Sequence, residues 1–567
     1  MAGDFEVTGD NTSALFNLKI YRGEGMALIA MNWKKGPPPK EFAGFSIEYR
    51  EPGGNRFFAL KNRLSFAGSD EADPNRLSTQ RSPIQKFRWV HFPRNAEIDG
   101  KFIYRVTPVF MNDADELSYG AAQEAAIVLR AETYPGKLNV TFTRGFVSSQ
   151  VFVDRYAKFG EFKTLIPAKA ATSLDFEPSH PKSEEALKWM GFEARQAILE
   201  TLDAAIKDKA EVRVVAYDLN EPALLERLEK VGGRLKIIID DSAEHGKPGS
   251  AETAAAKRLM ASAGKANIKR HHMKSLQHNK IIVVDGSKVK KAVCGSTNFS
   301  WRGFFVQSNN AVIVEGAKAI KPFLAAFDQY WNDEASFGKS ASAEWTNLGL
   351  DGIGAKIAFS PHSSSNALLE EIASDISGNT KSSLFFSLAF LYQTHGKLLS
   401  AIKLISSNKK LFVYGISDKK VGGLDLKKPD GNIAPVFPTA LAKNLPEPFS
   451  EEPSGGGGNR MHHKFVVVDF DKPSARVYFG SYNFSEPADV KNGENLLLIK
   501  DRRIAVSYMI EALRIFDHYH FRVALQESKK AKKKLELLKP PRKAGEKPWW
   551  DGYYHEARKI RDRELFA

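Results

Sequence analysis

The first 130 residues contain short segments in which apolar and polar residues alternate. Examples are "MALIAMNW" (26–33), "FAGFSIEYR" (42–50) and "KFIYRVTPVF" (101–110), and clusters of Gly, Pro and Asn separate them. Alternation with a period of two places the apolar side chains on one face of a strand. Short strands divided by turn residues at this spacing predict a small all-β sandwich over residues 1–132.

From about residue 135 the pattern changes to alternating helices and strands. Residues 183–207 have helical apolar spacing, and Ser183 is the expected N-cap. The apolar runs at 210–219 and 235–241 predict strands on either side of a helix at 222–233. This alternation predicts a layered α/β structure.

One strand-like segment occurs twice. "HNKIIVVDG" begins at His278 and "HHKFVVVDF" begins at His462. Each copy is followed by Gly-Ser-x-Asn at nearly the same distance, and the shared polar positions are Lys280, Asp285, Ser296 and Asn298 in the first copy and Lys464, Asp469, Ser481 and Asn483 in the second. The repeat predicts two similar α/β lobes, at 133–350 and 351–526.

The His and Lys of each motif lie on one face of the strand. Side chains alternate along a strand, so His278 and Lys280 point to the same side while Asp285 points to the other. The apolar run after Lys280 is typical of a strand covered on both faces. Each pair can therefore meet one ligand at the edge of the core. By the same parity, Asp285 and Asp469 have supporting roles away from it.

These motifs resemble the signature of the phospholipase D superfamily, His-x-Lys-x4-Asp followed by Gly-Ser-x-x-Asn or a close variant. The resemblance extends over about 390 residues. It implies two lobes packed about a pseudo-twofold axis, with both His-Lys pairs in one cleft. It also implies phosphodiester chemistry without a metal or any other cofactor.

The chemistry of that family suggests roles for the repeated residues. Lys280 and Lys464, with the amides of Asn298 and Asn483, would neutralise the nonbridging oxygens of a phosphodiester. By analogy, His278 is the expected nucleophile and forms a phosphohistidine. His462 is expected to protonate the leaving oxygen as an acid and then to deprotonate the incoming water or alcohol as a base.

An acid downstream of the motif commonly orients a catalytic His in this family. Glu494 occupies that place in the second copy, whereas Asn309 occupies it in the first. If the pairing crosses between lobes, Glu494 would fix the tautomer of His278, and His462 would have a neutral partner. Ser296 and Ser481 are expected to support the site.

The two ends of the chain carry weaker signals. Trp33, Tyr49 and Tyr104 resemble the pattern of fibronectin type III domains, which implies a contact or stabilising role and a possible protein partner. Residues 527–567 hold thirteen Lys and Arg against seven Asp and Glu. This tail is expected to contain a basic helix end, a Pro-marked break and an aromatic anchor. It presents either a solvated helix face or a contact with nucleic-acid phosphates or lipid headgroups.

Composition sets limits on the remaining possibilities. The net charge of +15 favours polyanionic partners. No apolar stretch approaches the roughly 20 residues that cross a bilayer, and the first residues lack a secretory pattern. We therefore expect a cytoplasmic protein, or one exported without a classical signal peptide. The single cysteine, Cys294, is expected to be a buried small hydrophobe.

Other candidate sites are less favoured. His271, His272 and His463 are expected to be solvated or packed histidines. A zinc site would need clustered Cys, His and acids, and the lone Cys294 argues against one. The segment 454–460, "SGGGGNR", lacks the Lys-Ser/Thr of a phosphate-binding loop and is interpreted as a lid or hinge.

Three functions remain open at this stage. The leading hypothesis is a phospholipase D-type enzyme that hydrolyses or transfers the phosphatidyl group of phospholipids. The second is a metal-independent nuclease that uses the same two histidines on DNA or RNA. The third is an inactive scaffold that binds through the β-sandwich, although both copies retain their His, Lys and Asn.

Overall fold

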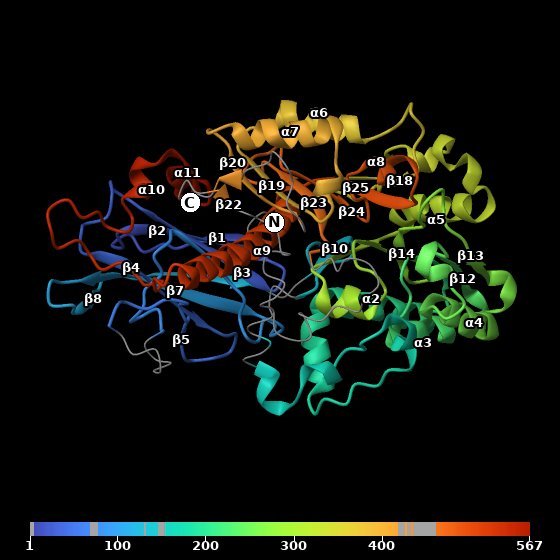
Figure 1. Ribbon diagram of the computed structural model, residues 1–567, viewed down its shortest axis with the longest axis horizontal. Coiled ribbons are helices and arrows are strands. Elements are labelled where there is room, and N and C mark those ends of the chain that lie inside the picture. Colours follow the sequence, from blue (N-terminus) through green and yellow to red (C-terminus); the bar gives the residue numbers. More distant parts are fainter. Residues whose placement is uncertain are drawn as a thin grey trace.

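The computed structural model describes residues 5–68, 77–129, 132–145, 152, 155–417, 426–427, 433–434 and 461–567. A β-sandwich lies at one end of an elongated molecule and two α/β lobes lie at the other (Figure 1). The chain then returns to the sandwich, so that its last helices lie beside its first strands.

The N-terminal region is an all-β sandwich, as predicted. One sheet has the order β1-β2-β3-β6, and in the other β5-β4-β7-β8 are joined by β9, which pairs with β7. The strands are β1 (Glu6–Thr8), β2 (Phe16–Gly23), β3 (Met26–Trp33), β4 (Phe42–Arg50), β5 (Phe58–Ala59), β6 (Arg88–His91), β7 (Lys101–Met111), β8 (Leu117–Tyr119) and β9 (Gln123–Val128). Trp33 and Tyr104 are buried between the sheets and Tyr49 packs against this core. The resemblance to fibronectin type III domains stays a prediction.

The first α/β lobe contains a mixed sheet in the order β10-β16-β15-β14-β11-β12-β13. Its strands are β10 (Leu138–Phe142), β11 (Glu211–Ala216), β12 (Leu235–Ile239), β13 (Ile268–Arg270), β14 (Lys280–Asp285), β15 (Lys290–Gly295) and β16 (Asn310–Glu315). Its helices are α2 (Ser183–Lys207), α3 (Pro222–Val231), α4 (Ala251–Ala263) and α5 (Ala317–Asn332). The first motif therefore lies on β14, a central strand.

The second lobe repeats this sheet in the order β17-β18-β25-β24-β23-β19-β20. Its strands are β17 (Thr346–Asn347), β18 (Gly354–Ser360), β19 (Ser383–Leu388), β20 (Phe412–Ile416), β23 (Lys464–Val468), β24 (Arg476–Gly480) and β25 (Glu494–Lys500), and a separate pair is β21 (Leu426–Lys427) with β22 (Ile433–Ala434). Its helices are α6 (Leu369–Asn379), α7 (Gly396–Ser407), α8 (Glu486–Val490) and α9 (Arg502–Lys530). Strand β23, which carries the second motif, occupies the place of β14, and the predicted two-lobed α/β fold is confirmed.

The two sheets share one apolar core, which α5 and α9 fill. This core includes Ile281 and Val283 of β14, Phe465 and Val467 of β23, and Leu513 of α9. The even-numbered neighbours on β14 face the opposite layer, where α2 covers the first sheet. Burial on both faces explains the unbroken apolar runs of the two motif strands.

Two local predictions differ from the structure. Ser183 is the first residue of α2 rather than its N-cap, because the residue in the cap position is Lys182, whose side chain makes no capping hydrogen bond. Thr346–Asn347 pair with β18 of the second sheet, although the predicted boundary at 350 placed them in the first lobe. Both differences lie at element ends, where sequence patterns carry the least information.

The tail returns to the β-sandwich after α9. Helix α9 extends to Lys530, and α10 (Gly552–His555) and α11 (Ala557–Leu565) follow. Trp549 Nε1 donates a hydrogen bond of 3.0 Å to the carbonyl oxygen of Phe42, and Trp550 is buried. Lys539 forms an ion pair of 3.0 Å with Asp115. Part of the basic charge of the tail is thus engaged within the chain.

Arg88 of β6 contacts three other elements, α9, α11 and β20. Its guanidinium is 2.7 Å from Asp517 of α9 and 2.7 Å from Asp562 of α11, and it donates to the Tyr414 hydroxyl of β20 at 3.1 Å. Arg88 is 3% exposed. A buried cation with two carboxylate partners leaves an uncompensated charge when either side is removed.

Replacing Arg88 with Met should lower the free energy of unfolding by about 3–5 kcal/mol, because it removes the buried cation that pairs with both Asp517 and Asp562. The matched control is Arg105→Met, which removes the exposed pair with Glu124 and should cost less than about 1 kcal/mol. Urea unfolding followed by tryptophan fluorescence measures both. Equal midpoints for the two variants would contradict the importance of the Arg88 cluster.

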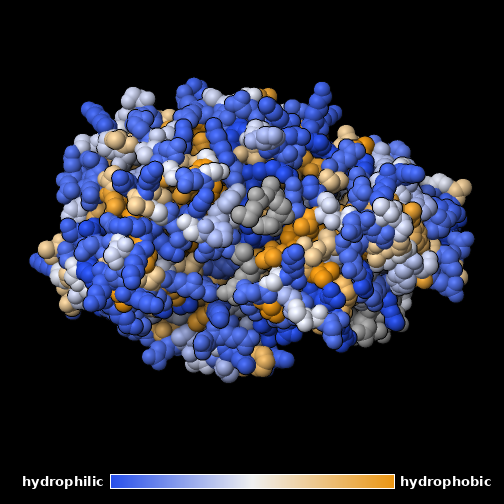
Figure 2. Space-filling view, turned by 180° about the vertical axis from the view of Figure 1, so that it is seen from behind, coloured by the Kyte–Doolittle hydropathy of each residue, from blue (hydrophilic) through white to orange (hydrophobic). Residues whose placement is uncertain are grey.

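One face of the molecule is largely hydrophilic (Figure 2). Figure 2 shows one face covered mostly by hydrophilic residues, with a smaller group of hydrophobic residues near its middle. Among the helices of the described residues, none combines the length and the apolar character needed to span a bilayer.

Candidate active site

The two motifs meet at one site between the lobes. The rings of His278 and His462 lie with their centroids 6.5 Å apart. Each His lies two residues before the first residue of a strand, which is the motif Lys. Lys464 Nζ donates a hydrogen bond of 2.8 Å to the carbonyl oxygen of His462. Lys280 Nζ makes the same contact with the carbonyl oxygen of His278. All four side chains are buried, so the two imidazole-ammonium pairs lie together at the edge of the core.

Backbone bridges between the lobes set this arrangement. Gln277 pairs with Gly493, and Ser308 pairs with Met461, each as an isolated parallel bridge. Because the bridges are parallel, the residues that follow the two bridged residues also lie side by side. The first brings His278 next to Glu494, and the second brings His462 next to Asn309.

Each catalytic candidate consequently hydrogen-bonds to the opposite lobe. His278 Nδ1 lies 2.8 Å from Glu494 Oε2, and His462 Nδ1 lies 2.8 Å from Asn309 Oδ1. Because both partner atoms are oxygen acceptors, both Nδ1 atoms carry the hydrogen. The Nε2 atoms are then left for chemistry. The cross-lobe pairing considered in the sequence is present, with a carboxylate on one side and an amide on the other.

Further contacts hold these two acceptors in place. Asn492 Nδ2 donates to Glu494 Oε1 at 3.1 Å. Ser296 Oγ donates to Asn309 Oδ1 at 3.0 Å, and Asn309 Nδ2 donates to the carbonyl oxygen of Gly303 at 2.9 Å. Asn309 Oδ1 accepts from Ser296 as well as from His462, so the amide cannot rotate without losing both bonds.

The Gly-Ser-x-Asn segments begin where β15 and β24 end. Gly295 and Gly480 have φ of 132° and 158°, and a Cβ at either would meet the carbonyl oxygen of Asn310 or Asn495 at 2.6 and 2.1 Å. Ser481 Oγ accepts the backbone N–H of Asn495 at 3.0 Å. The serines therefore join neighbouring strands, which is a supporting position.

The asparagines of these segments lie in a different environment. Asn298 is 5% exposed, and within the described part of the chain its Oδ1 has no hydrogen-bond partner. The buried Oδ1 of Asn483 is also without a partner among the described residues. A buried amide oxygen without a donor is unusual in a folded protein, and because it is an acceptor, a ligand would have to supply an N–H or O–H group to it.

The two motif aspartates lie at the far ends of their strands. Asp285 is the last residue of β14 and forms an ion pair with Lys290. Asp469 follows β23 and accepts the backbone N–H groups of Lys381 and Ser382 at 2.9 and 2.8 Å. These carboxylates stabilise loops at the end of the sheet away from the histidines.

Burial and the clustered cations keep the site free of excess positive charge. Burial lowers the pKa of His278, against the opposing effect of Glu494. Burial, with Lys464 and Lys280 nearby, holds the pKa of His462 well below its ordinary value. Burial lowers the pKa of Lys280 to about 8, and burial together with Lys280 lowers the pKa of Lys464 strongly. An anion bound beside the two lysines would favour the cationic forms of these groups and so raise their pKa values.

An aromatic residue lies beside each motif, and sequence reasoning missed both. The Tyr217 ring is 4.7 Å from the His278 ring, and Lys280 Nζ lies 4.7 Å from the Tyr217 ring centroid. In the second lobe Phe390 lies 6.4 Å from the His462 ring and 5.5 Å from Lys464 Nζ. Tyr217 follows β11 and Phe390 follows β19, and these two strands pair with the motif strands β14 and β23. An aromatic residue just after the corresponding strand in both copies of the repeat was therefore the signal that could have found them.

The other histidines lie outside the contact between the motifs. His463 Nε2 is bonded to buried Glu511 at 2.9 Å, on the opposite side of the strand from His462. His272 is exposed and paired with Asp241 at 2.7 Å, and His271 lies near Glu334. The segment 454–460, interpreted as a lid or hinge, lies outside the described residues.

Two parts of the chain match a known protein family, and a short segment matches curated relatives. The family described as "Cardiolipin synthase, PLD-like domain" matches residues 194–331 and 376–516, and each stretch contains one complete motif. A phospholipase D of Rickettsia prowazekii (strain Madrid E) is 44% identical over 48 residues, which are 8% of this chain and 22% of that relative. The chain thus spans about a fifth of the length of the curated relatives it matches.

Two solved structures also match parts of the chain. A phosphatidylserine synthase of Haemophilus influenzae Rd KW20 is 14% identical, with 65% of this chain and 93% of that chain covered and a TM-score of 0.38. Nuc of Salmonella typhimurium, a phospholipase D family member, is 30% identical, with 24% and 86% covered and a TM-score of 0.20. With two matched segments, each carrying His-x-Lys-x4-Asp, the chain belongs to the phospholipase D superfamily.

Proposed function

We propose that this protein is a phosphodiesterase of phospholipase D type, which hydrolyses or transfers the phosphatidyl group of phospholipids through a phosphohistidine. One observation carries the proposal. Two buried imidazoles with centroids 6.5 Å apart are each bonded through Nδ1 to the opposite lobe, and each has a motif lysine beside it. The spacing leaves room for a single phosphorus centre between the two Nε2 atoms.

The first half of the reaction forms the covalent intermediate. The Nε2 lone pair of His278 attacks phosphorus, while Glu494 stabilises the positive charge that develops on the ring. The bond from phosphorus to the leaving oxygen breaks, and that oxygen takes the proton from Nε2 of His462. Lys280 and Lys464 offset the charge on the nonbridging oxygens.

The second half reverses these movements. His462, now neutral, accepts a proton from water or an alcohol as that oxygen attacks phosphorus. The phosphorus–nitrogen bond breaks and its electron pair returns to His278. The protein's own side chains thus account for every proton and electron pair of the cycle.

The acid role of His462 depends on the substrate. Its pKa is low in the free protein because of burial and the two lysines. A phosphodiester monoanion between Lys280 and Lys464 offsets these cations and therefore raises the pKa of His462. Protonation of the acid is in this way coupled to binding of the anion.

The names of the relatives support a phospholipid as the substrate. The matched family is described as cardiolipin synthase, and curated relatives from Rickettsia are named phospholipase D. The headgroup oxygen would then be the leaving group, on the side of His462, and the phosphatidyl group would be transferred to His278. The two-histidine chemistry would act equally on a nucleic acid, so the substrate class is the point to test.

Purified protein should be incubated, with a chelator present, with vesicles of phosphatidylglycerol, phosphatidylethanolamine and phosphatidylcholine and, separately, with single- and double-stranded nucleic acids. We expect headgroup release, and with added ethanol the formation of phosphatidylethanol. A His278→Ala protein is the blank. Cleaved polynucleotides with intact lipids would replace the lipase by a nuclease. No reaction in either assay would leave a binding scaffold and reject the enzyme.

A further inference from the structure

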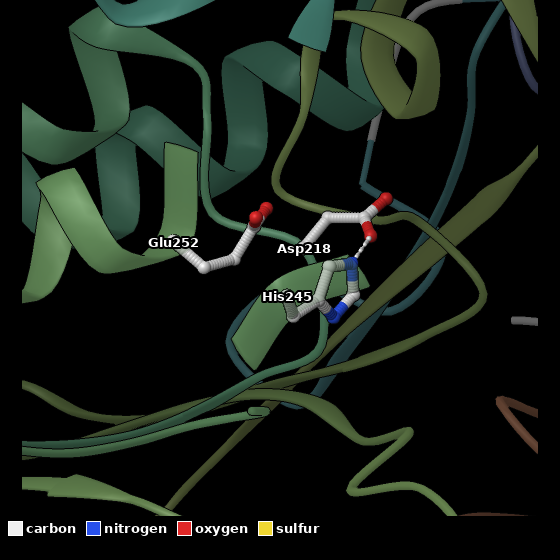
Figure 3. A group of neighbouring side chains, drawn as sticks. All are labelled: Asp218, His245 and Glu252. Carbon is white, nitrogen blue, oxygen red and sulfur yellow. Dashed lines mark ion pairs between the residues drawn. The ribbon is translucent and has the colours of Figure 1, made fainter. Parts of the chain in front are cut away.

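A second group of polar side chains lies beside the catalytic pair, in the first lobe. Asp218, His245 and Glu252 offer ligand atoms that all lie within 4.8 Å of one another, and Figure 3 shows the ion pair between Asp218 and His245 with Glu252 beside it. They come from three places: the loop after β11, the loop after β12 and the first turn of α4. Because β11 and β12 are parallel, their carboxyl ends meet at one edge of the sheet.

The two ring nitrogens of His245 lie near different carboxylates. Nδ1 lies 2.8 Å from Asp240 Oδ2, and Nε2 lies 3.2 Å from Asp218 Oδ1. Asp240 is 0% exposed, and Ser242 and the backbone N–H of Gln277 bond to it as well, so its position is fixed. A carboxylate on Nδ1 is the arrangement that orients a metal-binding histidine and leaves Nε2 for the ion.

The carboxylates supply a second, electrostatic argument. Glu252 is 4% exposed, and it accepts the backbone N–H of Leu219 at 3.2 Å. Asp218 is 20% exposed and Glu252 is buried, and their ligand atoms lie within 4.8 Å of each other, so a cation between them would offset the repulsion of the two carboxylates. The single imidazole next to them offsets one negative charge.

The site also has access to solvent and room for an ion with further ligands. A cavity of about 640 Å³ is lined by Asp218, His245 and Glu252 together with Ser300 and Trp301. Ser300 Oγ donates to Asp218 Oδ2 at 3.2 Å, and this leaves the other oxygen of Asp218 toward His245. One imidazole nitrogen and two carboxylates are three protein ligands, and the cavity can supply a water or an anion as the fourth.

We propose that Asp218, His245 and Glu252 bind a divalent transition-metal ion, for which zinc fits the donors best, and that Asp240 orients His245 as a ligand. Imidazole nitrogen and carboxylate oxygen at a tetrahedral site favour zinc over magnesium or calcium, which take oxygen ligands. The ion takes no part in the phosphohistidine chemistry. It is linked to the catalytic strand, since Asp240 holds the N–H of Gln277, the residue before His278.

The test is zinc binding by the full chain, after chelator treatment and dialysis. Calorimetric titration with zinc chloride should give one saturable site per chain, and inductively coupled plasma mass spectrometry should give one zinc per protein. Addition of cobalt(II) should produce visible d–d absorption of a tetrahedral site. His245→Ala and Glu252→Gln should lose the site, and Asp240→Asn should weaken binding about 10–100-fold.

The matched control is His272→Ala, because His272 is an exposed histidine of the same lobe that also pairs with an aspartate. This variant should bind zinc like the parent protein. Glu252→Gln keeps the side-chain shape, so it serves where His245→Ala unfolds, and circular dichroism checks both. Absence of a saturable site, or binding that survives Glu252→Gln, would overturn the proposal and assign the charge balance to a protonated His245 alone.

Discussion

Replacing His278 with Ala is expected to lower kcat on the natural phosphodiester on the order of 10⁴-fold or more, with little change in the unfolding midpoint. The variant removes the attacking nitrogen, and no other described side chain takes its place between Glu494 and His462. Initial rates under saturating substrate measure the effect. The matched control is His272→Ala, which should retain the parent rate because His272 is exposed and bonded to Asp241.

The assignment of the nucleophile needs a second measurement, because loss of either histidine stops the cycle. An aryl phosphodiester with a good leaving group needs no acid, so a His462→Ala protein should still form the phosphohistidine but hydrolyse it slowly. Mass spectrometry of its peptides should then find the adduct on His278. An adduct on His462 in the His278→Ala protein, with none in the converse experiment, would reverse the two roles.

The repeat made much of the site predictable from the sequence. His278 and His462 are each followed by Lys at two positions and Asp at seven, and each lies two residues before a central strand, β14 or β23. Both strands are apolar on both faces, which made their central place predictable. Lys280 and Asp285 are the first and last residues of β14, so they are separated along the strand, while the opposite faces that strand parity predicts stay a prediction. The pairing of Glu494 with His278 was one of the alternatives that the sequence left open.

What the sequence did not reveal comes from contacts between distant segments. The Tyr217 ring packs edge-to-face against the His278 ring because β11 pairs with β14, and only the comparison with the aromatic after the corresponding strand of the second lobe could have indicated it. His245 lies between Asp218 and Asp240 only after two parallel strands end at one edge of the sheet. The bridge between Ser308 and Met461 joins residues 153 positions apart, and it alone brings Asn309 to His462. Such placements depend on tertiary pairing rather than on periodicity.

The carboxylate of Glu494 is the strongest difference between the two halves of the site, and Glu494→Gln is expected to lower kcat about 10²–10⁴-fold. Gln keeps the shape and an acceptor for His278 Nδ1, but it removes the negative charge that stabilises the cationic ring of the intermediate. In the free protein Glu494 raises the pKa of His278 against the effect of burial. Removing the charge must therefore lower that pKa further.

A second variant, Asn309→Asp, tests the effect of a carboxylate on the other histidine, His462. Asn309→Asp places a carboxylate on Nδ1 of His462 and should raise the pKa of that ring, which burial and the two lysines now hold low. Histidine ¹³C NMR titration of both variants measures the two shifts, which should have opposite signs. If Glu494→Gln left both the His278 pKa and kcat unchanged, the carboxylate would only pack against the ring, and the unequal roles of the two histidines would need another cause.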